Sequence, residues 1–562
     1  MDTGVAGTGR FARAGALLVV VALAGCSLLV AQGSTQCTSD GDCARYHGTR
    51  CVQGGCVIEP VAFDAAIPAD YPCTSTQDCL SLHGANWVCR EQACFSLASE
   101  DCGLVVGNYA ADDVLLVGAL LPLVGAHKST GLPLERVLAL AAQQDFIRGV
   151  PFGTDGPHPV AIVLCDESQN PARAAQHLVR DVRVPVILGP AFGDAFEAAA
   201  AAVSATGASV DGGPVVLISP YATAPLDAFE ADAGVPPALL WRTSPEAAGE
   251  GAAMSQLVST LLEPRIKTEQ GSAPMGVALV WRDDSDGRAL RDALEASLVF
   301  NGAPATSQPA GFFTDVSYGN PDDPNDDLST AAVTQITGKS PLPALVIVDG
   351  AAEAIASILG GIEGALSGQT SARPYYLLSH GVQVEELLSY VTPLPSLRKR
   401  ILLAVPGDGD TNDSLRELRI AYDKQYSDYP AETFGVPQAY DAFYLLAYAL
   451  AAVRNTDVNG LDVRDGLHRV IYGDGSVQPV TVGSAGIDAG FTAILAGGSV
   501  ALTGASGPLQ FDARTNTPAE NVQIWCVTPT PDGDASTFSA AGLAWSQDAG
   551  KLSGTLASDC LQ

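Results

Sequence analysis

The sequence predicts an α/β protein in which two doubly wound α/β lobes follow a small disulfide-rich segment. From about residue 103, apolar runs of strand length alternate with amphipathic stretches, and this alternation restarts once. The strand-like runs are apolar throughout, which indicates parallel strands covered by helices on both faces. Eight of the 13 cysteines lie within residues 37–94. With 562 residues, of which 47% are hydrophobic, the chain is long enough for more than one core.

Residues 1–25 are predicted to be a signal peptide for export. Arg10 and Arg13 precede an apolar run over residues 14–24, the layout of a basic region followed by an apolar region. That run is about half the ~20 residues that a membrane-spanning helix needs, and no later stretch is long enough and free enough of charge.

The signal is predicted to end at a lipidation site, Cys26. The sequence LAGC that ends there resembles the lipobox of bacterial lipoproteins, in which cleavage before the cysteine leaves a thiol that carries a diacylglycerol. An ordinary signal peptide followed by an unpaired thiol is the alternative. With Cys26 set aside, 12 cysteines remain, an even number. We expect a protein of the bacterial cell envelope, facing the periplasm or the exterior and held to the membrane by its lipid alone, with residues 26–36 as a tether.

Residues 37–102 are predicted to contain two disulfide-stabilised repeats. The sequences CTSDGDCARYHGTRCVQGGC and CTSTQDCLSLHGANWVCREQAC share Thr-Ser after the first cysteine, Asp before the second and His-Gly before the third. Units of about 20 residues cannot build a sufficient core, so disulfides worth about 2–4 kcal/mol each must stabilise them. A zinc site with His47 and His83 is the alternative, which the spacing disfavours. The repeat cysteines are Cys37, Cys43, Cys51, Cys56, Cys73, Cys79, Cys89 and Cys94.

Four further cysteines lie outside the repeats and leave three pairings open. We favour Cys526 with Cys560, because both lie in the terminal segment. The other two are Cys102 and Cys165.

Two sets of strands and helices follow the repeats. In the first, apolar residues at three- and four-residue steps over 132–146 predict a helix, and short apolar runs predict strands on either side of it. The first set is expected to alternate strand and helix over 112–125, 132–146, 158–167, 170–182, 184–190, 195–206 and 213–220. The second set is expected to do so over 273–284, 287–300, 344–350, 351–362 and 373–380.

Seven motifs follow one another between about residue 112 and residue 530: VGALLPLVGAHKSTG, CDESQNPARAAQHLVRD, VILGPAFGDAFEAAAAA, VVLISPYATAP, WRTSPEAAGEGAAM, GVPQAYDAFYLLAYALAAV and GASGPLQFDARTN. Their order resembles the type I periplasmic binding proteins of ABC transporters, in the leucine/isoleucine/valine-binding branch. The resemblance implies two lobes that close on a small solute by a hinge, and permease subunits as partners.

The resemblance also implies domain boundaries. The first lobe is expected to comprise residues 103–240 and 408–497, and the second 241–407 and 498–535. Residues 536–562 are then a C-terminal extension.

Position by position, the resemblance places a ligand site in the loops that face the cleft. Residues 192–194 stand where the family usually has Ser-rich carboxylate ligands, and residues 221–223 align with its Ala-Ala-Thr, so that the Thr223 hydroxyl is suited to a carboxylate. The predicted ligand-binding residues are Phe192, Gly193, Asp194, Tyr221, Ala222, Thr223, Asp284, Asp286 and His380.

Several of these positions depart from the family's pattern. Asp286 and residues 350–352 stand where aromatic residues are usual, and His380 lies near the position of an acidic residue that takes the ammonium. The α-amino-acid ligand class therefore does not carry over directly. Asp194, Asp284 and Asp286 would make the cleft electronegative and favour a cationic or polyhydroxylated solute. The alternative for each aspartate is a solvated loop position.

Other chemistry finds little support. PGDGDTND, at 406–413, departs from a calcium loop because Asp413 and Arg419 replace the required Gly and Glu, and NPDDPNDD, at 320–327, is predicted to be a solvated turn. Metallopeptidase, nucleophile-elbow and phosphate-loop motifs are absent, so we expect no enzyme, no metal and no cofactor. The net charge of −32 disfavours nucleic acid as a partner.

The sequence therefore predicts a lipid-anchored solute-binding protein that captures a small polar ligand, an amino acid, an amide or a related solute, for an ABC importer. The alternative is an envelope sensor or interaction lipoprotein with the same fold, whose Cys-rich repeats bind an envelope protein.

Overall fold

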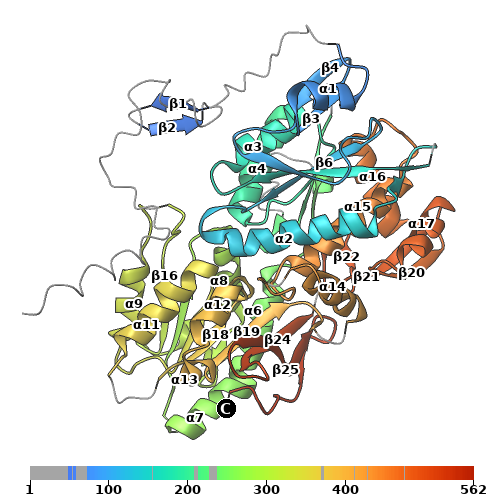
Figure 1. The fold of residues 1–562 in the computed structure, drawn as a ribbon. Coiled ribbons are helices and arrows are strands. Elements are labelled where there is room, and N and C mark those ends of the chain that lie inside the picture. Colours follow the sequence, from blue (N-terminus) through green and yellow to red (C-terminus); the bar gives the residue numbers. More distant parts are fainter. Residues whose placement is uncertain are drawn as a thin grey trace, which may run out of the picture. The chain divides into compact units, whose positions relative to one another are not determined.

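The computed structural model divides the chain into two units, residues 1–67 and 68–562. In the first unit, strand β1 (Thr49–Val52) pairs antiparallel with β2 (Gly55–Ile58) (Figure 1). The predicted signal peptide, Cys26 and the tether lie outside the described residues, as do Cys37 and Cys43. The structure describes residues 49–52, 55–58 and 72–561, except 155, 208–212, 227–236, 272, 324, 369–372, 410–411, 427, 474 and 520. Within these residues, no helix has the length and apolar character that crossing a membrane requires.

The second Cys-rich repeat folds as helix α1 (Thr76–His83) followed by a hairpin of β3 (Trp87–Arg90) and β4 (Ala93–Ser96). A capping box begins the helix: the Asp78 backbone N–H donates to Ser75 Oγ at 3.3 Å, and the Ser75 N–H donates to the Asp78 carboxylate at 2.9 Å. The Thr-Ser and Asp of this repeat therefore start its helix. Two disulfides join the helix segment to the hairpin: Cys73–Cys89 and Cys79–Cys94.

The first lobe is built on a six-stranded sheet in the order β12-β11-β10-β6-β9-β5. Its strands are parallel except β5, which runs antiparallel to β9 at the edge. Cys102 of β5 faces Cys165 of β9, and the two form a disulfide. The strands are β5 (Cys102–Val106), β6 (Leu115–Leu121), β9 (Val160–Asp166), β10 (Val186–Leu188), β11 (Val216–Ser219) and β12 (Leu240–Arg242).

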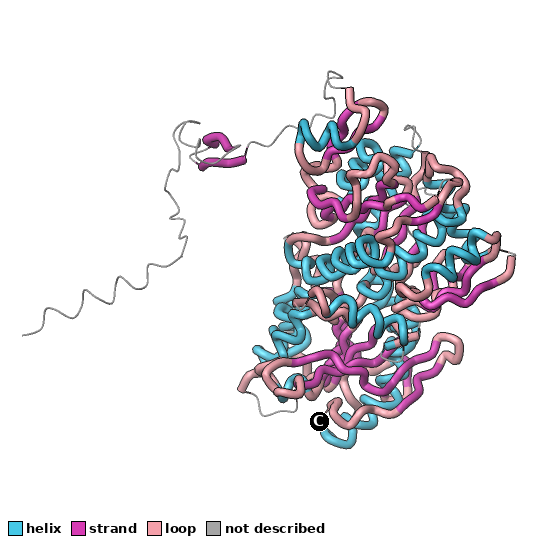
Figure 2. The backbone as a smooth tube through the Cα atoms, turned by 45° about the vertical axis from the view of Figure 1, so that its right-hand side comes forward, coloured by secondary structure: helices cyan, strands magenta, loops and turns pink. Residues whose placement is uncertain are grey.

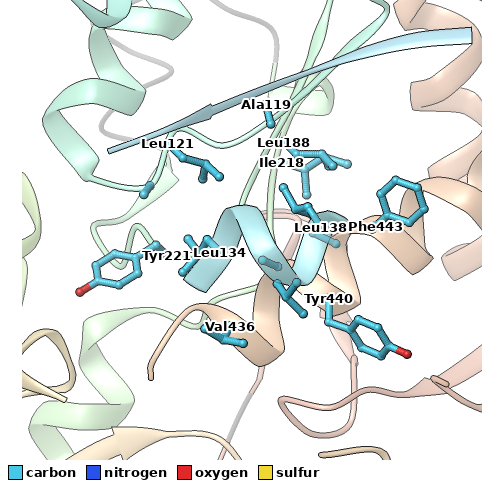
Figure 3. Close-up of a cluster of buried hydrophobic side chains, with 14 of the residues drawn as sticks. Ala119, Leu121, Leu134, Leu138, Leu188, Ile218, Tyr221, Val436, Tyr440 and Phe443 are labelled. Atoms are coloured by element: carbon cyan, nitrogen blue, oxygen red, sulfur yellow. The ribbon is translucent and has the colours of Figure 1, made fainter. Parts of the chain in front are cut away.

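Helices cover both faces of this sheet. Helices α3 and α4 pack together, and α15 packs against α2 and α16 (Figure 1). Figure 3 shows Leu134 and Leu138 of α2 between Leu188 and Ile218 of the sheet and Val436 of α15. All 17 residues of α15 are buried, and all but Gln438 and Asp441 are apolar or aromatic. The helices are α2 (Lys128–Leu140), α3 (Pro171–His177), α4 (Gly193–Gly207), α15 (Val436–Ala452) and α16 (Gly460–Tyr472).

The second lobe is built on an eight-stranded sheet in the order β16-β13-β17-β18-β19-β24-β25-β26. The first five strands in this order, β16, β13, β17, β18 and β19, pair in parallel. Strands β24, β25 and β26 add three antiparallel strands. The strands are β13 (Val277–Trp281), β16 (Phe313–Ser317), β17 (Leu345–Val348), β18 (Tyr375–Leu378), β19 (Ile401–Pro406), β24 (Val522–Pro529), β25 (Ser536–Ser546) and β26 (Lys551–Gly554). The accompanying helices are α6 (Ala247–Leu257), α7 (Glu263–Gln270), α8 (Ser285–Ser297), α9 (Ser329–Thr337), α10 (Ala352–Ala354), α11 (Gly360–Ala365), α12 (Glu385–Val391) and α13 (Pro395–Arg398).

The predicted C-terminal extension, 536–562, is part of this sheet, because it supplies β25 and β26. The structure pairs Cys526 with Cys560, the pairing that the sequence favours, and so ties the C-terminal segment to β24. Residues 498–518, expected in the second lobe, contact the first. Strand β21 (Ser499–Thr503) pairs with β20 (Val477–Thr481), and β23 (Thr517–Pro518) lies beside β12. Short strands carry no sequence signal for the sheet that they join.

The chain passes between the two lobes at several connections. One lies between β12 and α6, one between β19 and α14 (Asp413–Asp423), and one between β23 and β24. Figure 2 shows the strands of the two sheets in separate regions of the second unit, each with helices around it. The remaining first-lobe helices and strands are α14 (Asp413–Asp423), α17 (Ile487–Leu495), β7 (Val150–Pro151), β8 (Pro157–His158), β20 (Val477–Thr481), β21 (Ser499–Thr503), β22 (Phe511–Asp512) and β23 (Thr517–Pro518).

The disulfide at the edge of the first sheet gives a stability prediction. Replacing both Cys102 and Cys165 with alanine should lower the free energy of unfolding by about 2–4 kcal/mol, because the bond closes a long loop in the unfolded chain. Urea unfolding under oxidising conditions measures the change. An unchanged unfolding midpoint would show that the edge strand adds nothing through this bond.

Candidate functional site

The candidate site lies between the lobes, where loops from the carboxyl ends of both sheets meet. Segments after β10 and β11 approach from the first lobe, and segments after β13, β17 and β18 from the second. In open α/β sheets this edge is where ligands bind. The described residues around the pocket are Phe192, Tyr221, Arg282, Asp284, Asp286, Gly287, Asp349, Gly350, Ala351, His380 and Gly381.

Five of the predicted ligand-binding residues line this pocket: Phe192, Tyr221, Asp284, Asp286 and His380. The other four lie beside it. Gly193, Asp194 and Thr223 make contacts between the lobes. The Ala222 carbonyl instead accepts a hydrogen bond from Ser244 Oγ, which joins its loop to the segment after β12.

The Asp286 carboxylate crosses from the second lobe into a cluster of backbone N–H groups of the first. Oδ2 accepts from Gly193 N–H at 2.7 Å. Oδ1 accepts from Thr223 N–H at 2.7 Å and Ala224 N–H at 2.9 Å, with the Thr223 hydroxyl at 3.5 Å. Here three N–H groups from two loops converge on one carboxylate.

Asp194 makes the reciprocal contact. Its Oδ1 accepts from the Ser285 N–H of α8 at 2.9 Å. Helix α4 begins at Gly193 and α8 at Ser285, so each helix receives a carboxylate from the first turn of the other. A Cβ at Gly193 would lie 2.2 Å from Ser285 Oγ and 2.9 Å from Asp286 Oδ1, so any other residue would displace these two side chains.

Glu167, directly after β9, supports the loop that carries Phe192. Its carboxylate accepts from Ala191 N–H at 2.8 Å and Phe192 N–H at 3.1 Å. Burial raises the pKa of Glu167 to about 8, although both N–H groups act in the opposite direction.

His380 is paired with a buried acid that the sequence analysis did not single out. Its Nδ1 lies 2.6 Å from Glu250 Oε2, and its backbone N–H donates to Glu250 Oε1 at 2.9 Å. Burial lowers the pKa of His380, but Glu250, together with Asp349 and Asp286, outweighs burial and the pKa is raised. Glu250 is 0% exposed. A lone glutamate among small residues of α6, AAGEGAAMSQL, is the signal that marks such a buried charge.

Arg282 organises the opposite wall of the pocket. Its Nε lies 2.7 Å from Asp284, and one of its terminal nitrogens lies 3.3 Å from Glu353. Asp322 also pairs with Arg282, and its carboxylate lies 2.8 Å from Nε2 of His127 in the first lobe. The run 320–327 is therefore more than the solvated turn that the sequence predicts. Its charge pattern carries no information about these distant partners.

The space left between the lobes is small. The pocket has a volume of about 20 Å³, enough for a water molecule or two and too little for an amino acid. A second cavity of about 30 Å³ lies beside Phe434, near Gln383. We place the functional site at the smaller one, because loops from the carboxyl ends of both sheets converge there.

The two lobes and the pocket between them define the type I periplasmic-binding-protein fold, as the sequence predicts. Three solved structures with this fold are similar to the chain at low identity. LivJ, the branched-chain amino acid transporter substrate-binding protein of Streptococcus pneumoniae, in complex with isoleucine, has a TM-score of 0.53 at 18% identity; the match covers 76% of this chain and 99% of that chain.

The leucine-binding protein LivK of Thermotoga maritima has a TM-score of 0.53 at 15% identity, covering 77% of this chain and 99% of that chain. A solute-binding protein of an ABC transporter from Rhodopseudomonas palustris, in complex with 3,4-dihydroxybenzoic acid, has a TM-score of 0.52 at 17% identity, covering 79% and 98%. No protein-family model matches the sequence, and no curated protein does.

The buried Asp349 gives a pH prediction. Burial raises its pKa from 3.8 to about 6, against the influence of His380 and a Ser379 hydrogen bond. The folded state therefore favours the protonated form, and stability is lost as the pH rises from about 4 to about 6. Relative to wild type, Asp349→Asn should become more stable over that window, by up to about 3 kcal/mol.

Urea unfolding at a series of pH values measures this difference. Asp548→Asn, in the exposed turn between β25 and β26, is the matched control and should show no such trend. A constant difference between Asp349→Asn and wild type across the window would contradict the prediction.

Proposed function

We propose that the protein is an extracytoplasmic solute-binding protein that takes a small polar solute between its lobes and presents it to the permease subunits of an ABC importer. One observation carries the proposal: loops from the carboxyl ends of both sheets meet at one pocket, which aromatic side chains of the first lobe and charged side chains of the second line together. Connections between the lobes allow them to separate and close around a solute as rigid bodies.

The likeness in fold supports this role. LivJ was solved with isoleucine and the Rhodopseudomonas palustris protein with 3,4-dihydroxybenzoic acid, both small solutes. Under this proposal, residues 1–25 direct export, Cys26 carries the lipid anchor, and the Cys-rich repeats hold the lobes away from the membrane. The lobes follow the boundaries given above, adjusted at 498–518 and 536–562 to the sheets that these residues join.

Binding a solute as large as isoleucine or 3,4-dihydroxybenzoic acid requires the lobes to open. The pocket volume of about 20 Å³ leaves room for little more than water. In the open state, water would replace the carboxylates at the helix N-termini of Gly193 and Ser285. We infer that the structure is the closed state of a hinged receptor.

A sensor or interaction protein of the envelope is the second candidate. The observation that favours it is the reciprocal contact of Asp194 and Asp286, since the lobes close here on each other's carboxylates. In that function the closed form is the active form, and the Cys-rich repeats bind an envelope protein.

A panel of solutes separates the two candidates. Amino acids, amides, polyamines and sugars are added to the mature protein in a thermal-shift measurement. A true ligand at a hundred times its Kd stabilises by about 2.7 kcal/mol and raises Tm. At least one solute is expected to do so for wild type and for the exposed control Asp548→Asn. A panel without any shift would count against solute binding and favour the sensor.

A further inference from the structure

We propose that Asp286 is a specificity-determining residue: its carboxylate acts as an internal ligand of the first lobe and excludes carboxylate solutes from the cleft. This inference rests on the proposed solute-binding function and names the class of solute, which is neutral or cationic and lacks a carboxylate.

The first lobe holds a cradle that requires an acceptor whenever the lobes are closed. The cradle consists of the N–H groups of Gly193, Thr223 and Ala224, which all donate to Asp286. Thr223 is 1% exposed and Ala224 3% exposed, so water cannot reach these groups freely. A buried N–H without a partner costs about 1–3 kcal/mol. Three buried N–H groups in one place strongly favour an anion as their shared acceptor.

The charge of the cradle is suited to a carboxylate. Gly193 is the first residue of the 15-residue helix α4, whose N-terminus carries a partial positive charge. A carboxylate with two oxygens can bridge the helix N-terminus and the segment after β11, as Asp286 does. A solute carboxylate would require the same N–H groups and the same space.

Asp286 reaches the cradle from the other lobe and competes with any such solute. It is the second residue of α8, and the Asp194 bond to Ser285 fixes that helix start against the first lobe. A group tethered on the same chain acts at an effective concentration in the millimolar range or above. A solute carboxylate must therefore displace Asp286 from the cradle against this effective concentration.

The surrounding charge acts in the same direction. Asp349 also lines the pocket, and its carboxylate repels a second anion. The cations of the lining are paired, His380 with Glu250 and Arg282 with Asp284. An anionic solute therefore meets acids, paired cations and an occupied cradle.

The test removes the internal ligand from the mature full-length protein. Wild type, Asp286→Ala and Asp286→Asn are titrated calorimetrically with isoleucine, benzoate and the neutral counterpart benzamide. Asp286→Ala should bind at least one of the carboxylates at least about tenfold more tightly than wild type. Asp286→Asn keeps the shape but loses the charge, and should gain less. Circular dichroism shows whether each variant is folded. If Asp286→Ala is not folded, Asp286→Asn takes its place in the test.

Asp194→Ala is the matched control. It removes the other contact between α4 and α8 but leaves Asp286 in the cradle, so it should gain no carboxylate affinity. An equal gain in Asp194→Ala would show that loosening the lobes, rather than emptying the cradle, admits the solute, and would overturn the inference.

Two further outcomes decide the inference and the proposed function separately. If wild type binds a carboxylate as tightly as Asp286→Ala does, the inference is overturned and solute binding is supported. If Asp286→Ala gains affinity for carboxylates while wild type binds nothing in the thermal-shift panel, the inference is supported. The sensor is then favoured as the native function. Folded Asp286 variants without any gain overturn the inference, whatever wild type binds.

Discussion

The contact between the first turns of α4 and α8 sets the relation of the two lobes. A helix N-terminus leaves backbone N–H groups without partners, and burying them unpaired is costly. Here each N-terminus meets a carboxylate from the opposite helix, Asp286 for α4 and Asp194 for α8. Closing the lobes therefore also supplies the hydrogen-bond acceptors that these N–H groups need. Because Gly193 has no side chain, the two helix starts can approach this closely.

Paired charges form the walls around that contact. Arg282 is held by Asp284 and Glu353, and His380 by Glu250, because a buried charge is tolerated only when it is paired. These pairs fix the loops after β13 and β18 and leave few groups for a solute. The chemistry of the cleft then depends on the residual acidic charge and on the N–H cradle.

The disulfides strengthen the parts of the molecule that do not move in a hinged receptor. Among the described residues, Cys102–Cys165 ties an edge strand to the first sheet, and Cys526–Cys560 ties the C-terminal segment to the second. The other two lie within the second Cys-rich repeat. None of these four bonds joins the two lobes, so the connections between them keep the freedom that opening requires.

The sequence by itself determined the fold and the loops of the site. Buried parallel strands must be apolar on both faces, so runs such as 158–167 mark the sheets, and loops after such strands must meet at one edge. The partners across that edge followed from tertiary structure alone. Glu250 lies 130 positions from His380, and Asp286 is 93 positions from Gly193. From the sequence, Asp286 is an acid just before the helix expected over 287–300 and a candidate for contact with a solute. Which helix N-terminus its carboxylate meets was decided by the packing of the lobes, because hydrogen bonds act over 3 Å in space and not along the chain.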